Sequence, residues 1–163
     1  MLSGLVPQDI KSLDGFNLLQ RRAVKWIFKE PYISYSDQKF LTKQRELDIL
    51  PMKYKFLFSD LTLFHQIVYN KVQIKLPNYV TRIEPQDVKH RTRNNVTIFE
   101  GTDKLQFKCN IVPKINAFKN NYFVRTLKHW NDLPLSLREE ENFERFSLAL
   151  KDHLWLILGF EPD

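Results

Sequence analysis

The stretch from Pro51 to Tyr69 constrains the fold more than any other part of the sequence, because its apolar residues predict one long helix. They occupy nearly two faces of that helix: Tyr54, Leu57, Phe58, Leu61, Phe64, Ile67 and Val68. A helix that is apolar on more than one side must be covered on more than one side. With 163 residues, 43% of them hydrophobic, we expect one domain over residues 1–163 built around this helix.

Three further segments have helical periodicity. The first is predicted from Phe16 to Phe28, with Phe16, Leu19, Ala23 and Ile27 as its buried row and Pro31 as its end. The second is predicted from Asp37 to Leu47, where Ser36 and Asp37 can cap the free amides of its first turn. The last is predicted from Asn142 to Leu158, followed by Gly159 as a C-terminal cap.

One extended region is predicted between these helices. Val96–Phe99 and Lys104–Lys108 flank a Gly-containing turn, and the second run alternates polar and apolar residues, which is typical of a β-hairpin. Residues 71–95 contain Pro77 and Pro85 and are expected to be irregular. The predicted fold is therefore α+β and mainly α, a single helical domain with a small β-hairpin at one edge.

The run from Phe118 to Pro134 combines an aromatic stripe with a basic face. Residues at spacings of three and four share one side of a predicted helix: Phe118, Tyr122, Phe123, Leu127 and Trp130. Cations lie around the rest of it, and Pro134 ends it. Taken alone, the pattern is typical of a helix that buries its aromatic side and solvates its charged side.

Several short motifs follow one another along the chain. They are Leu19–Ile27 (LQRRAVKWI), Tyr35–Asp37 (YSD), Leu47–Tyr54 (LDILPMKY) with Asp60-Leu61, Lys119–Arg125 (KNNYFVR), Trp130–Pro134 (WNDLP) with Arg138, and Phe146. In this order they resemble the C-terminal segment of non-LTR retrotransposon reverse transcriptases, the long open reading frames common in invertebrate genomes. The resemblance implies the segment that follows the catalytic palm of an RNA-directed DNA polymerase.

The sequence lacks the residues on which such a polymerase depends. A palm needs closely placed carboxylates, normally adjacent aspartates, to hold two metal ions, and here no two aspartates are adjacent. We therefore expect no enzyme activity, no catalytic residues, no cofactor and no metal site. Cys109 is the only cysteine, which excludes an internal disulfide and a Cys-rich zinc knuckle. The four histidines are interpreted as ordinary surface or helix residues.

The excess of basic residues, 25 against 19 acidic, favours polyanionic partners. The expected function is a non-catalytic accessory segment that contacts template RNA or target DNA through basic helix faces. The candidate nucleic-acid-binding residues are Arg21, Arg22, Lys25, Arg91, Arg93, Lys119, Arg125 and Lys128. Arg91 and Arg93 belong to a cationic run that is either a solvated loop or a phosphate-contacting one. A buried Arg125 paired with Asp132 is a structural alternative for that arginine.

A second hypothesis makes the chain a helical docking module that packs against the polymerase body of a full-length parent protein. An exposed apolar patch would favour this docking hypothesis, and a continuous basic surface would favour nucleic-acid binding. An independent hydrolase is the least supported reading, because no catalytic triad order or phosphate-binding glycine loop is present. No apolar run is long enough to cross a membrane, and the N-terminus lacks a signal peptide pattern. We expect an intracellular protein, with nucleus and cytoplasm not distinguished.

Overall fold

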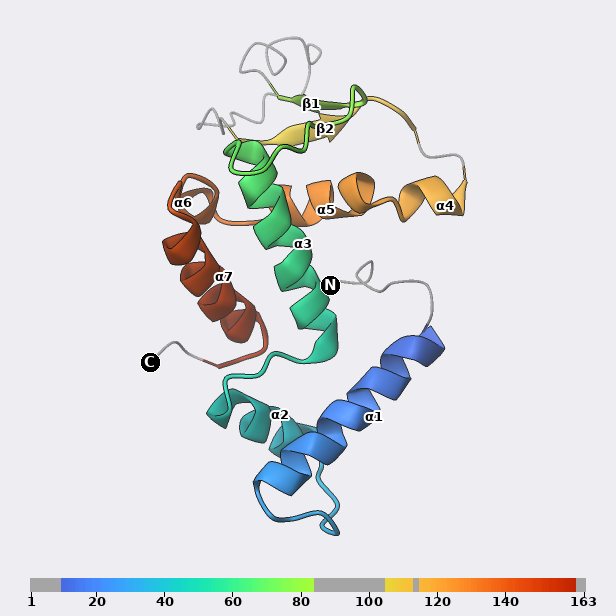
Figure 1. The fold of residues 1–163 in the computed structure, drawn as a ribbon, viewed down its shortest axis with the longest axis vertical. Helices are drawn as coiled ribbons and strands as arrows, with labels where there is room; N and C mark the ends of the chain where they lie inside the picture. The colour runs from blue at the N-terminus through green and yellow to red at the C-terminus, as the bar shows by residue number, and fades with distance from the viewer. Residues whose placement is uncertain (1–9, 84–104, 113–114, 161–163) are drawn as a thin grey trace, which may run out of the picture. The chain divides into compact units, whose positions relative to one another are not determined.

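The structure, a computed structural model, describes residues 10–83, 105–112 and 115–160 (Figure 1). It is mainly helical with a small two-stranded antiparallel sheet, so the predicted α+β, mainly α class is confirmed. The residues form two compact units, Met1–Asp60 with Leu148–Asp163, and Leu61–Ser147. The single domain over residues 1–163 stays a prediction.

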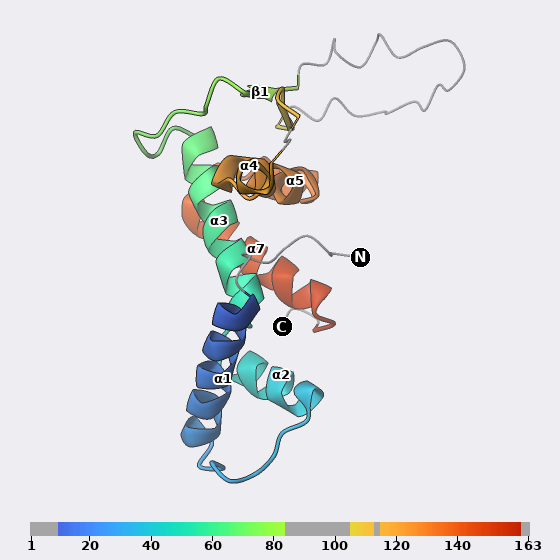
Figure 2. The same cartoon turned by 90° about the vertical axis from the view of Figure 1, so that its right-hand side faces the viewer.

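The first unit contains α1 (Ile10–Ile27), α2 (Asp37–Glu46) and parts of α3 (Met52–Val68) and α7 (Phe143–Ile157). Figures 1 and 2 show α1 and α2 side by side. Their contact is a small apolar cluster, composed of Val24, Tyr35, Phe40, Phe28 and Leu47. The Ser36 side chain accepts a hydrogen bond from the Lys39 amide, as predicted for the cap of α2. The two helices are therefore held by a local core of their own.

The predicted buried row of α1 is wrong. Leu19 and Ile27 are 60% and 55% exposed, and Phe16 and Ala23 are exposed as well, whereas Val24 is only 1% exposed. Apolar residues occupy two neighbouring sides of α1, and α2 covers the side that carries Val24. Helical periodicity identifies apolar sides but does not say which of them a neighbouring helix covers.

The second unit contains the remainder of α3, β1 (Val80–Arg82), β2 (Phe107–Cys109), α4 (Asn116–Lys119), α5 (Tyr122–Asn131), α6 (Leu135–Arg138) and the start of α7. Its core is aromatic. Phe64 of α3 lies with its ring centroid 5.1 Å from Trp130 and 5.5 Å from Phe107. Phe146 is also fully buried and lies 6.0 Å from Trp130. The long apolar α3 and the aromatic side of α5 thus meet as the sequence predicts.

The strand pairing differs from the predicted hairpin. β2 pairs antiparallel with β1, in the register Val80↔Cys109, so a strand forms within the segment expected to be irregular. Residues 96–99, the predicted partner, lie outside the described residues. The other edge of β2 is occupied, because the Asn131 side chain accepts from the Phe107 amide at 3.1 Å and donates to its carbonyl at 2.7 Å. A side chain of α5 therefore takes the place of a second strand.

The helix predicted to continue from Phe118 is divided in two. α4 ends at Lys119, and Asn121 has extended backbone angles (φ −54, ψ 140). The Asn121 side chain accepts a hydrogen bond from the Phe123 amide at 3.0 Å and so caps α5. Asparagine is favoured at this position because its side chain replaces the missing helical acceptor.

The long helices end with the same backbone turn. A residue with positive φ follows each helix: Lys29, Asp48, Asn70 and Gly159. The next amide then bonds back to a carbonyl of the last turn, as Lys71 does to Gln66 at 2.7 Å. The C-terminal cap predicted at Gly159 is confirmed, while α1 ends at Ile27, before Pro31 is reached.

Candidate interaction surfaces

α1 carries an exposed apolar surface. Its members lie three or four residues apart on one side of the helix and are defined here as the α1 stripe: Phe16, Leu19, Ala23, Trp26 and Ile27. Trp26 is 72% exposed, while Trp130 and Trp155 are fully buried. Except for Trp26, the members of the stripe are the predicted buried row of α1, but they face solvent instead of a core. Such a surface is typical of a contact with another molecule.

Cations border the stripe on one flank. Arg22 is exposed and lies three residues after Leu19 and four before Trp26, which places it beside the stripe. Lys29 is exposed at the end of α1, on the same flank as Arg22, whereas the Lys25 ammonium lies 5.4 Å from the centroid of the Tyr35 ring and is therefore on the side of α1 that faces α2. Within the part of the chain that the structure describes, none of these three cations forms an ion pair.

Neighbouring acids are matched by other cations. Asp37 pairs with Arg21 at 2.7 Å, Glu30 with Lys39 at 3.4 Å, and Glu46 with Lys43 at 3.2 Å. Glu30 also accepts a hydrogen bond from the Tyr35 hydroxyl at 2.6 Å, which raises the pKa of Tyr35 to about 12 and lowers the pKa of Glu30. Because these acids are paired with other cations, they do not neutralise the positive charge beside the α1 stripe.

Arg21, a predicted nucleic-acid contact, connects α1 to the segment that leads into α2. Its guanidinium donates to the Tyr35 carbonyl at 3.2 Å and to the Asp37 carboxylate at 2.7 Å. It also lies 4.6 Å from the centroid of the Phe40 ring. Sequence spacing groups Arg21 with Arg22 and Lys25, but these contacts separate its role from theirs. Arg21 is part of the fold of the first unit.

The remaining predicted cations belong to the second unit or lie outside the described residues. Arg125 and Lys128 are exposed on α5, on the side away from the buried Leu127 and Trp130, and Lys119 is exposed on α4. Arg125 donates to the Asn120 carbonyl at 3.3 Å and lies 5.9 Å from the Tyr122 ring centroid. The alternative of a buried Arg125 is therefore wrong. Arg91 and Arg93 lie outside the described residues.

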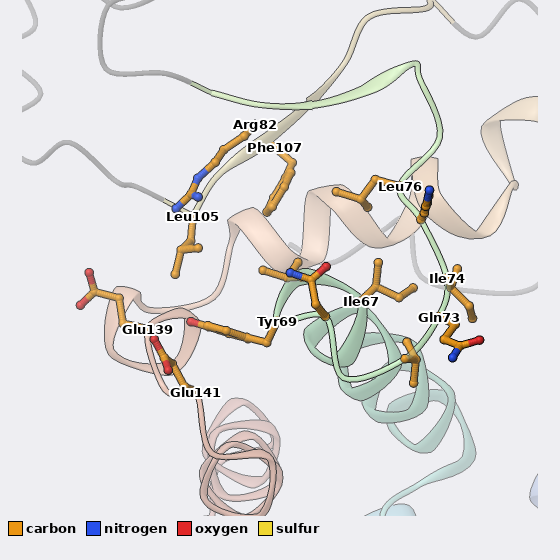
Figure 3. Close-up of a pocket in the computed structure, with 14 residues that line it drawn as sticks. Ile67, Tyr69, Gln73, Ile74, Leu76, Arg82, Leu105, Phe107, Glu139 and Glu141 are labelled. Atoms are coloured by element: carbon orange, nitrogen blue, oxygen red, sulfur yellow. The ribbon is translucent and has the colours of Figure 1, made fainter.

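The second unit also has an open cavity of about 1220 Å³, shown in Figure 3. The end of α3 and the following loop line the cavity on one side, Leu105, Phe107 and Arg82 lie across from them, and Glu139 and Glu141 come from a third segment. The Tyr69 hydroxyl donates to the Arg138 carbonyl at 2.7 Å, and burial, then the nearby carboxylates, raise the pKa of Tyr69. No sequence pattern predicts this cavity, because its walls come from segments far apart in the chain.

His65 lies on α3, in keeping with its interpretation as a helix histidine, but it is fully buried in the second unit and is not a surface residue. Its ring stacks on Phe146 with centroids 4.1 Å apart, and its Nε2 lies 2.7 Å from the Glu140 carbonyl oxygen. Burial lowers the pKa of His65. The signal that could have revealed it is its position one residue after Phe64, on the doubly apolar α3.

The described residues do not bring together the side chains that a metal site needs. No cluster of three or more His, Cys, Asp or Glu side chains that could hold a metal ion occurs among residues 10–83, 105–112 and 115–160. No helix in these ranges is long and apolar enough to cross a membrane. Comparisons with protein-family models, curated proteins and solved structures find no match to the chain. The resemblance to reverse transcriptases therefore stays a prediction from its motifs.

Proposed function

We propose that the chain is a non-catalytic accessory segment of a non-LTR retrotransposon reverse transcriptase and that it docks on the polymerase body through the α1 stripe. The observation that carries the proposal is the exposure of Leu19, Trp26 and Ile27 on one side of α1. The motifs that resemble such polymerases, one of which spans Leu19–Ile27, support the choice of partner.

Burial of the stripe would provide the driving force for docking. Removing a large apolar side chain from water stabilises a complex by about 1.5–3 kcal/mol when burial is complete. Several half-exposed side chains can together offset part of the translational and rotational entropy lost on association. An aromatic anchor such as Trp26 is the residue type most enriched in the energetic centres of protein interfaces. The composition of the stripe is thus typical of a protein contact.

The test compares neutral polar variants, so that charge does not change. Leu19→Gln with Ile27→Gln places two polar side chains within the α1 stripe, and Leu148→Gln is the control at another exposed apolar position, because Leu148 of α7 is 67% exposed in the same unit. The probe is the purified palm-and-thumb region of a non-LTR reverse transcriptase, with binding followed by sedimentation velocity. We expect the wild-type chain and Leu148→Gln to bind and the double variant to lose binding. Equal binding of all three would contradict docking through α1.

Nucleic-acid contact through α4 and α5 is the second candidate function. The observation that favours it is the exposure of Lys119, Arg125 and Lys128 in neighbouring helices of the second unit. Flexible cations of this kind contact phosphates without reading base sequence, so binding should weaken steeply with salt.

A titration of single-stranded RNA at several salt concentrations tests this candidate. The slope of the logarithm of RNA affinity against the logarithm of salt concentration, called the salt slope, counts the phosphate contacts. Lys128→Gln should lower this slope by about one phosphate contact, whereas Lys55→Gln, at an exposed position of α3, should leave it unchanged. Absence of RNA binding at low salt would remove the nucleic-acid role. An equal loss of slope in both variants would show that binding follows net charge and not the α5 surface.

A further inference from the structure

We infer that the α1 stripe takes an acidic-rimmed apolar protein surface, meaning an apolar helix or groove bordered by carboxylates. This inference rests on the proposed function and adds the chemistry of the partner. It follows from the composition of the stripe together with the sign and pairing of the charges beside it. A partner of this chemistry buries Leu19, Trp26 and Ile27 while its carboxylates meet Arg22 and its neighbours.

The size of the stripe fits a helix-sized contact. Phe16 and Ile27 are eleven residues apart on a regular helix, which corresponds to about 16 Å along its axis. Three turns of apolar side chains with spacings of three and four match the pattern by which amphipathic helices occupy grooves. The stripe is therefore long enough for a partner helix or for the groove between two helices.

The charges beside the stripe have one sign. Arg22 and Lys29 are exposed in the last turns of α1 and just after it, and neither forms an ion pair with another described residue. Nearby acids such as Glu30 and Asp37 already have cationic partners. Complementary charge at the rim of an interface raises the association rate and selects the partner. The complementary groups in this case are carboxylates.

A second copy of the chain is a poor occupant by the same reasoning. Two α1 helices packed through their stripes would bring the cations of one copy close to those of the other, and like charges at an interface disfavour the pair. A nucleic acid fits the cations, but Leu19, Ala23 and Ile27 offer it no hydrogen bonds, and only Trp26 could stack on a base. Both occupants are outcomes that the following experiment separates.

The experiment uses two labelled synthetic helical peptides with the same Leu/Ala face, one with Glu and the other with Lys on both flanks. Fluorescence anisotropy measures their affinities for the whole chain. At low salt we expect the Glu peptide to bind about tenfold more tightly than the Lys peptide, with a ratio that falls as salt screens the charges. Arg22→Gln with Lys29→Gln should bring the ratio towards one, and Lys55→Gln should leave it unchanged.

The neutral double variant Leu19→Gln, Ile27→Gln should bind neither peptide, which distinguishes docking on the stripe from general attraction to a basic protein. Equal affinity of the wild-type chain for the two peptides would overturn the inferred acidic rim and leave docking intact. Binding of neither peptide would overturn docking through the stripe as well. A dimer, or a complex with an oligouridine RNA, that the double variant abolishes would assign the stripe to that occupant and overturn the inference.

Discussion

Replacing Trp130 should remove a large part of the stability of the second unit. The indole is fully buried, its ring lies 5.1 Å from Phe64, and its Nε1 donates a hydrogen bond of 2.8 Å to the Leu105 carbonyl. Truncating a buried Trp to Ala costs about 3–5 kcal/mol, through lost burial and the cavity that remains. Since small domains are stable by only about 5–15 kcal/mol, the Ala variant should be marginally folded.

A second substitution separates packing from hydrogen bonding. Trp130→Phe keeps an aromatic ring but removes the donor to Leu105, so we expect a smaller loss of about 1–3 kcal/mol. Urea denaturation followed by far-UV circular dichroism measures both variants without depending on Trp fluorescence. A loss below about 1 kcal/mol in Trp130→Ala, with a native spectrum, would refute the argument that the indole is a core residue.

Three further predictions concern the buried His65, Asn70 at the end of α3, and Arg21. The pKa of His65 is lowered from its ordinary value of 6.5, so the unfolded chain binds a proton more readily; stability should be full above pH 6.5 and fall as pH drops below it. His65→Gln should reduce this pH dependence of the melting temperature without abolishing it, because burial lowers the pKa of His153 too. Asn70 has φ 54, so Asn70→Ala should lose about 1 kcal/mol in urea denaturation while Asn70→Gly does not. Arg21→Gln should lower stability by about 1 kcal/mol and leave the salt slope of RNA binding unchanged, because its contacts are to Tyr35, Asp37 and Phe40.

The extent of a helix with a regular apolar row was predictable from the sequence. α7 was expected from Asn142 to Leu158 and occupies Phe143–Ile157, because Phe146, Leu150 and Leu154 recur at helical spacing and are buried together. α1 was predicted as a helix, but its buried side was assigned wrongly. Periodicity reports which side chains avoid water, and the length and position of α2 decide which of them are covered.

Sequence spacing did not predict the contacts between segments that are far apart in the chain. The partner of β2 was expected in the adjacent segment, yet β2 pairs with Val80–Arg82 and bonds to the Asn131 side chain on its other edge. An amide side chain that binds a strand edge has no periodic signature. The break at Asn121 has a local cause in its capping side chain, but the aromatic spacing across it favoured one continuous helix.

Sequence spacing also did not predict the contacts of residues in the candidate interaction surfaces. Arg21 and Arg22 are adjacent in the sequence and were both predicted to contact nucleic acid, but Arg21 bonds to Asp37 whereas Arg22 is exposed beside the stripe. A charge count does not distinguish the two, since pairing depends on how the loop after α1 returns to it. The cavity beside Tyr69 likewise depends on Glu139 and Glu141, which are about seventy residues away in sequence.

Acrylamide quenching of Trp fluorescence tests the exposed stripe, on which the docking proposal depends, most directly. Trp26 is exposed while Trp130 and Trp155 are buried, so the difference between the wild-type chain and Trp26→Phe isolates the signal of Trp26. We predict that Trp26 emits at long wavelength and is quenched nearly as readily as a free indole in the monomeric chain. A blue-shifted Trp26 that acrylamide does not reach in the monomer would contradict the account, because the stripe would then already be covered.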